Sequence, residues 1–76
     1  MNVPDLVGKN VRAYRELMGI SQERLADIAG LHRTYITQVE QGKRNLTVIS
    51  IFKIAKALEI EPPLLLIPDS WKKKIK

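Results

Sequence analysis

The 76-residue chain contains no cysteine, one histidine, one tryptophan, one phenylalanine and two tyrosines. Without cysteine it has no disulfide bonds and no cysteine-ligated metal site. The single histidine, His32, has no second ligand beside it and is a poor metal site. The sequence also lacks a glycine-rich phosphate-binding loop and a set of nucleophile, histidine and acid. We therefore expect neither a metal nor another cofactor, and we do not expect an enzyme.

Long hydrophobic runs are also missing from the sequence. Spanning a bilayer takes about 20 consecutive apolar residues, and no run approaches that length. The first residues do not show the charged start and apolar stretch of a secretory signal. These absences predict a cytoplasmic protein that has no membrane partner.

The charge of the chain is positive but unevenly distributed. Of the 13 basic residues, four are lysines at positions 72, 73, 74 and 76, and the other nine are nearly balanced by eight acidic residues. We predict one domain over residues 1–70 and a basic tail over residues 71–76. The tail either attracts phosphate nonspecifically or is a frayed, solvated terminus.

Apolar residues recur with the period of an α-helix along most of the chain, which predicts an all-α fold. Ser21 and Thr47 are good N-caps, and Gly19 and Gly30 are suitable helix stops. The expected helices are residues 5–18, 22–29, 33–41, 48–58 and 62–67. The predicted buried face of the fourth helix comprises Val48, Ile51, Phe52, Ala55 and Leu58. The prediction is therefore a five-helix bundle without strands.

The third predicted helix has one polar and one apolar face. At about 100° per residue, Ile36 and Val39 lie opposite four polar residues. These polar residues are Arg33, Thr34, Thr37 and Gln38. An arginine fork matches the O6 and N7 acceptors of guanine, and a glutamine amide can pair with adenine. The polar face therefore indicates contacts with DNA bases, and the alternative is an ordinary solvated helix surface.

Residues 22–41 form two short predicted helices that meet at a turn marked by Gly30, which is the layout of a helix-turn-helix. The stretch resembles the Cro/repressor type of helix-turn-helix domain, the Xre family, at five characteristic positions. These positions are Gln22, Ala26, Gly30, Ile36 and Val39. The resemblance extends from about Val7 to Leu66 and implies a lambda-repressor-like fold.

The resemblance also implies roles for individual side chains. The four polar residues of the third helix would contact bases. Residues expected to contact DNA phosphates are Gln22, Tyr35, Lys43, Arg44 and Asn45. For Tyr35 the alternative is partial packing in the core, and for Lys43 and Arg44 it is a solvated loop.

Arg15 resembles an arginine of this family that pairs with a glutamate at the end of the recognition helix, here Glu40. If the two charges are buried they must be paired, because a lone buried charge is very costly. We predict that Glu40→Ala destabilises the fold rather than altering sequence preference.

The segment after the fourth helix is expected to form a dimer interface. Four consecutive large aliphatic residues cannot all enter one small core, and an exposed apolar patch indicates a partner surface. The expected interface comprises Ile60, Pro63, Leu64, Leu65, Leu66 and Ile67. The alternative is that Leu65 and one neighbour close the core of a monomer. Trp71 either covers this patch or lies in the tail.

Together these features predict a transcriptional regulator that binds double-stranded DNA sequence-specifically, as a homodimer on a pseudo-palindromic operator. Residues 32–47 resemble the controller proteins of restriction–modification systems, which implies autoregulation of an operon. RNA polymerase is then a further candidate partner, and without a sensing domain no small-molecule ligand is expected. The alternatives are a phage or mobile-element repressor of the Xre type and the antitoxin of a toxin–antitoxin pair.

Overall fold

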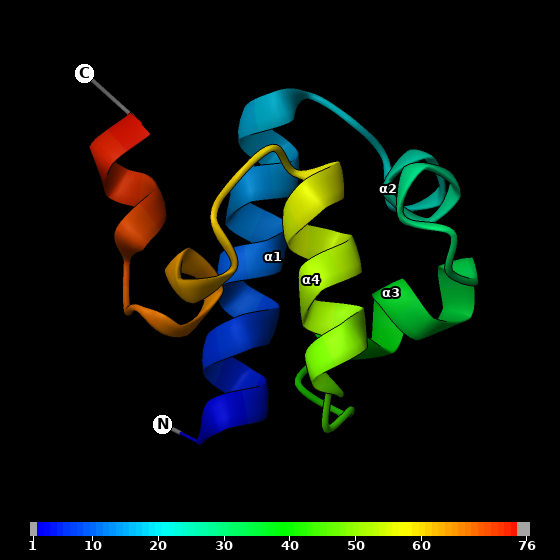
Figure 1. The fold of residues 1–76 in the computed structure, drawn as a ribbon, viewed down its shortest axis with the longest axis horizontal. Coiled ribbons are helices and arrows are strands. Elements are labelled where there is room, and N and C mark those ends of the chain that lie inside the picture. The colour runs from blue at the N-terminus through cyan, green and yellow to red at the C-terminus, as the bar shows by residue number, and fades with distance from the viewer. Residues whose placement is uncertain (1, 75–76) are drawn as a thin grey trace.

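The structure is a computed structural model that describes residues 2–74 (Figure 1). Four α-helices are followed by two short 3-10 helices, and the described residues contain no strand. The elements are α1 (Val3–Met18), α2 (Gln22–Ala29), α3 (Arg33–Glu40), α4 (Val48–Ala57), η1 (Pro62–Leu66) and η2 (Ser70–Lys74). The predicted all-α class is confirmed. The count of five helices is not, because the fifth is a 3-10 helix and another follows it.

Local capping explains where the helices begin and end. The side chains of Ser21 and Thr47 each accept a hydrogen bond of 3.0 Å from the backbone N–H three residues later. Gly19 and Gly30 adopt left-handed φ angles of 73° and 70°, which end α1 and α2. His32 precedes α3 without a side-chain cap. The caps predicted from the sequence are therefore confirmed, and α2 and α4 begin at the expected residues.

α1 lies near the centre of the molecule (Figure 1). It packs against α3, η1 and η2, while α4 contacts α2 and η1. The helices contribute their apolar stripes to a single core. Its buried residues are Val7, Val11, Tyr14, Leu25, Ala26, Ala29, Ile36, Val39, Ile54, Ala55, Ala57, Leu58 and Leu65.

A close approach between α1 and α3 occurs at Gly8. A Cβ atom at this position would overlap the backbone carbonyl oxygen of Val39 and would lie 3.1 Å from that of Glu40. Glycine interrupts the sequence of α1 here because no side chain fits between the two helices. The end of α3 is thereby held directly against α1.

α4 presents a different face to the core from the predicted one. Val48 and Phe52, expected to be buried, are 69% and 57% exposed. Ile54 and Ala57 are buried in their place, next to Ala55 as predicted. Apolar residues occur on several sides of this helix, so the helical period alone does not select one face. Packing against α2 and η1 makes that selection.

α4 ends at a left-handed residue that is not glycine. Glu59 has a φ angle of 59°, and the backbone N–H of Ile60 donates a hydrogen bond of 3.0 Å to the carbonyl oxygen of Ala55. This is the Schellman arrangement, which glycine usually completes because other residues are strained there. The turn directs the chain from α4 into η1.

A buried asparagine connects α1 with η1. The Asn10 carboxamide donates to the backbone carbonyl oxygens of Leu65 at 2.9 Å and of Ile67 at 3.0 Å. Asn10 is only 1% exposed, so these bonds replace the water that its amide would otherwise need. The contact fixes η1 on α1, and sequence reasoning missed it because the partners are backbone groups far along the chain.

The residues predicted to form a basic tail continue the fold instead. Ser70–Lys74 forms η2, and the Tyr14 hydroxyl donates to the Ser70 hydroxyl at 2.9 Å. Trp71 is partly buried against the core. Lys76, also assigned to the tail, lies outside the described residues.

Candidate nucleic-acid interface

The polar face of α3 lies on the surface of the molecule. Arg33 and Thr34 are exposed and Thr37 and Gln38 are half-buried, while Ile36 on the opposite side is fully buried. A shallow concave surface of about 460 Å³ lies over this face. Its lining comprises Gln22, Arg33, Thr34, Thr37, Gln38 and Gln41. The structure thus brings Gln22 together with the four residues expected to contact bases, and adds Gln41, which sequence reasoning did not single out.

An ion pair between Arg15 of α1 and Glu40 connects the end of α3 to α1. Arg15 Nε and Nη2 donate to the two carboxylate oxygens of Glu40 at 2.7 and 3.1 Å, and Nη1 donates to the Ile20 carbonyl at 2.9 Å. The two side chains are only 13% and 4% exposed. The hydrogen bonds to Glu40 raise the pKa of Arg15 above its ordinary value, because they favour the charged guanidinium. The structure places the pair in the contact that the sequence suggested.

The nitrogen and the oxygen of the Gln22 side-chain amide each form a hydrogen bond. Its Nε2 donates to Glu40 at 3.1 Å, and its Oε1 accepts from the Thr37 hydroxyl at 2.9 Å. One N–H of the amide is left for a further acceptor, because the group carries two. The expected phosphate contact of Gln22 can therefore use only that hydrogen. The bond to Thr37 joins two helices and has no signature in the spacing of either.

Arg44, from the loop after α3, covers the next turn of the helix. Its guanidinium lies 5.1 Å from the centre of the Tyr35 ring, and its Nε donates to Gln38 Oε1 at 2.7 Å. Tyr35 is half-buried, so the partial packing considered as an alternative is present. Lys43 and Asn45 are exposed beside it. The loop therefore places two cationic side chains next to the polar face of α3.

Residues 11–65, spanning the whole of this arrangement, match the family model described as helix-turn-helix. The chain belongs to the helix-turn-helix family. Its members are DNA-binding regulators rather than enzymes, and the predicted Xre-type resemblance is confirmed.

Several similar proteins are control proteins. Control protein C.SmaI from Serratia marcescens is 44% identical over 72 residues, which cover 95% of this chain and 86% of that protein. Control protein C.BamHI from Bacillus amyloliquefaciens is 46% identical over 66 residues, covering 86% and 82%. The crystal structure of the restriction-modification controller protein C.AhdI from Aeromonas hydrophila superposes with a TM-score of 0.79 at 44% identity, covering 82% and 94%. The resemblance to controller proteins is therefore confirmed.

A second surface of this helix-turn-helix protein is apolar. Val48 and Phe52 of α4 and Pro63 and Leu66 of η1 are exposed around a groove of about 210 Å³. The half-buried Ile51 and Pro62 complete its lining. We call the four exposed residues the α4–η1 patch.

The α4–η1 patch differs in part from the expected dimer interface. Leu65 is fully buried, so it belongs to the core and not to the surface. Ile60 and Leu64 are half-buried, and Ile67 is 48% exposed beside Leu66. The patch extends onto α4, which sequence reasoning missed because it assigned Val48 and Phe52 to the core.

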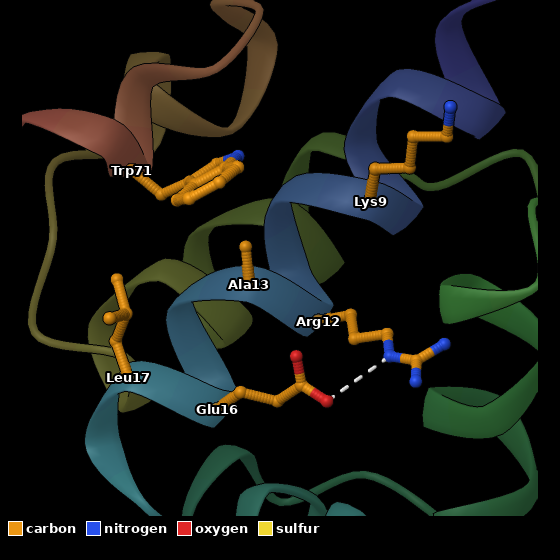
Figure 2. Close-up of a pocket in the computed structure, with 6 residues that line it drawn as sticks. All are labelled: Lys9, Arg12, Ala13, Glu16, Leu17 and Trp71. Carbon is orange, nitrogen blue, oxygen red and sulfur yellow. Dashed lines mark hydrogen bonds and ion pairs between the residues drawn. The ribbon is translucent and has the colours of Figure 1, made fainter.

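Trp71 lies on neither of these two surfaces. Figure 2 shows its indole ring over α1 with Ala13 beneath it and Leu17 to one side. Trp71 lines a separate groove here, together with Lys9 and an exposed ion pair of 3.3 Å between Arg12 and Glu16. In Figure 1, η2 is on the far side of α1 from α2 and α3. Trp71 therefore neither covers the α4–η1 patch nor lies in a free tail.

Residues 2–74 contain neither a metal site nor a membrane span of the kinds described next. No three His, Cys, Asp or Glu side chains in this range are placed to hold a metal ion. None of the helices in it has both the length and the hydropathy needed to span a bilayer.

Proposed function

We propose that this protein is the controller of a restriction–modification operon and that it binds a pseudo-palindromic operator as a homodimer. The observation that carries the proposal is the outer face of α3, where Thr37 and Gln38 are oriented by bonds to Gln22 and Arg44. The names of C.SmaI and C.BamHI favour a controller over a phage repressor or an antitoxin. Such a protein acts in the cytoplasm and responds to its own concentration.

The base contacts come from α3 in the major groove. Arg33 and Thr34 are exposed on this helix. Arg33 can present its fork to guanine O6 and N7. The carbonyl oxygen of Gln38 accepts one hydrogen bond from Arg44, and its two amide N–H groups can donate to base acceptors.

The phosphate contacts flank the base contacts. Gln22 lies in the first turn of α2, where the backbone N–H groups and the helix dipole favour an anion. Lys43, Arg44 and Asn45 follow α3 and are exposed. The Arg44 guanidinium lies over the Tyr35 ring, 5.1 Å from its centre. Together these groups position α3 on the duplex without specifying sequence.

The dimer forms through the α4–η1 patch. One recognition helix contacts only a few base pairs, and a two-fold partner places a second helix about 34 Å away, one turn of DNA. Phe52 is the largest exposed side chain of the patch and is expected to be its anchor. Burying such side chains contributes about 25 cal/mol per Å² of apolar surface removed from water.

The test of DNA recognition is selection of bound duplexes from a random pool at moderate salt. We expect a two-fold symmetric motif with half-sites about 10 base pairs apart. Arg33→Ala should relax one position of each half-site at a cost of about 1–3 kcal/mol, whereas Lys9→Ala on α1 should leave the motif unchanged. A pool without enrichment would contradict sequence-specific binding.

The test of assembly is sedimentation equilibrium of the wild type at tens of micromolar, where a dimer mass is expected. A monomer mass at this concentration would remove the dimer from the proposal. Transcription from the selected operator, followed over a range of protein concentrations with RNA polymerase, then distinguishes activation from repression.

A further inference from the structure

A continuous chain of hydrogen bonds connects α1 with the outer face of α3. It runs from Arg15 to Glu40, from Glu40 to Gln22 and from Gln22 to Thr37, with donor–acceptor distances of 2.7 to 3.1 Å. The chemistry at its buried end determines the direction of every later bond.

The buried end consists of one group that only donates and one that only accepts. An arginine guanidinium has no acceptor, and an ionised carboxylate has no donor. The Glu40 side chain is 4% exposed, so its oxygens must be met by protein donors rather than by water. Gln22 therefore turns its amide nitrogen, and not its carbonyl oxygen, toward Glu40.

The orientation of Gln22 determines the role of the Thr37 hydroxyl. With Nε2 directed at Glu40, the Oε1 atom faces Thr37, one turn earlier on α3, and the Thr37 hydroxyl must donate to it. The reversed amide would set a carbonyl oxygen against the Glu40 carboxylate with no proton between them, which is unfavourable. The single hydroxyl proton of Thr37 is thus committed to Gln22. Only its lone pairs remain for the concave surface over α3.

We propose that Thr37 is an acceptor-only contact in the major groove, selective for the exocyclic amino group of adenine or cytosine, and that Gln22 is its positioning residue. A free threonine hydroxyl can donate or accept, so it does not distinguish these amino groups from the carbonyl oxygens of thymine and guanine. The inference rests on the proposed function, because it requires α3 in the major groove. It adds that Thr37 acts as the acceptor, and not the donor, in one base contact.

The first step of the test locates the base pair that Thr37 contacts. Duplexes are selected with the wild type and with Thr37→Val, which replaces the hydroxyl by a methyl group of similar size. We expect the variant to lose the preference at one position of each half-site and to keep the rest. Thr37→Ser, which retains the hydroxyl, should restore it. Circular dichroism melting confirms that each variant is folded.

The second step measures whether Thr37 accepts from the amino group or donates to the carbonyl oxygen of that base pair. Each base pair carries one amino group and one carbonyl oxygen in the major groove. Analogues that lack only the amino group, purine for adenine or pyrimidinone for cytosine, should weaken wild-type binding about tenfold. Analogues that lack only the carbonyl oxygen should change it less than about twofold. Thr37→Val should respond to neither.

Gln22→Met tests the positioning role. It frees the Thr37 proton, so the variant should accept the reversed base pair at this position, which the wild type rejects. Loss of the Gln22 phosphate contact would weaken all sequences alike and so cannot mimic this change.

Two results overturn the inference while the proposed function stands. One is an unchanged motif for Thr37→Val, and the other is a large cost for removing the carbonyl oxygen but not the amino group. Rejection of the reversed pair by folded Gln22→Met overturns the positioning role of Gln22. If this variant does not fold, the analogue measurement still decides whether Thr37 acts as an acceptor. A wild type that enriches no sequence overturns the proposed function and the inference together.

Discussion

The two outward surfaces of the domain are built in opposite ways. On the α2–α3 side, polar side chains are held in pairs, Thr37 by Gln22 and Gln38 by Arg44. On the α4–η1 side, apolar side chains such as Phe52 are simply left uncovered. Hydrogen bonding is directional, so base contacts need donors and acceptors held in fixed orientations. Apolar association is non-directional and scales with buried area, so it needs only a surface of suitable shape.

Both surfaces are nevertheless anchored to the same helix. Arg15 holds the α2–α3 side, which we call the recognition side, through the buried ion pair with Glu40. Asn10 holds η1 through the carbonyl oxygens of Leu65 and Ile67. α1 therefore sets the relative position of the surface proposed to contact DNA and the surface proposed to contact a second copy. This division suggests that each surface can be disrupted separately.

The largest effect should come from removing the anchor of the recognition side. Glu40→Ala leaves the Arg15 guanidinium buried without its partner, which should lower the free energy of unfolding by about 3–5 kcal/mol. Urea denaturation measures it, with exposed Glu23→Ala as the control. A midpoint equal to that of the control would contradict the structural role. Because Glu40 also accepts from Gln22, we now expect residual DNA binding to be less selective at the Thr37 position, which revises the earlier expectation.

The next effect concerns the apolar side. Phe52→Lys places a charge in the centre of the α4–η1 patch and should weaken dimerisation by about 2–4 kcal/mol, with little change in monomer folding. Sedimentation at several concentrations measures the dissociation constant. Leu17→Lys, also at an exposed apolar position but on the Trp71 side of α1, is the matched control. Equal weakening by both variants would show that the patch is not the interface.

A smaller loss is expected at the contact between α1 and α3. Gly8→Ala introduces a Cβ atom against the carbonyl oxygens of Val39 and Glu40, and such overpacking costs about 1–3 kcal/mol. Thermal unfolding measures it, and Lys9→Ala on the exposed side of the same turn should change little. If operator binding falls with Gly8→Ala while dimerisation does not, the two surfaces are disrupted separately. A variant as stable as wild type would mean that the helices separate without cost.

The smallest effect should be a gain. Glu59→Gly relieves the left-handed backbone at the end of α4 and should stabilise the fold by about 0.5–1 kcal/mol. Glu61→Gly, two residues away in extended backbone, should not stabilise it. Denaturant midpoints of the two variants measure the difference. A loss of stability in Glu59→Gly would mean that the glutamate side chain contributes more than the strain costs.

The recognition side was largely predictable because its signals are local. The polar and apolar faces of α3, the Ser21 cap and the Gly30 stop all follow from spacing along a few turns. The direction of each side chain did not follow, since Gln22 meets Thr37 only after two helices have packed. A helical wheel places residues on faces but does not pair them across elements.

The apolar side was less predictable for the opposite reason. α4 has apolar residues on several sides, so periodicity could not separate exposed Val48 and Phe52 from buried Ile54. Likewise, the lysines after Trp71 suggested a solvated tail, and the indole that anchors η2 on α1 has no local signature. Where composition is uniform, tertiary packing decides which residues are buried.

The Asn10 contact has a consequence for how the protein is made. Its carboxamide donates to the Leu65 carbonyl, which lies 55 residues further along the chain. This separation is most of the length of the domain. Contacts of such long sequence separation form late and slow folding, because the intervening chain must be ordered first. During synthesis the recognition helix leaves the ribosome well before η1 does. A chain interrupted before residue 65 would leave a buried amide unsatisfied, so we expect that only nearly complete molecules bind DNA. If the protein regulates its own operon as proposed, that operon would respond to complete molecules and not to fragments.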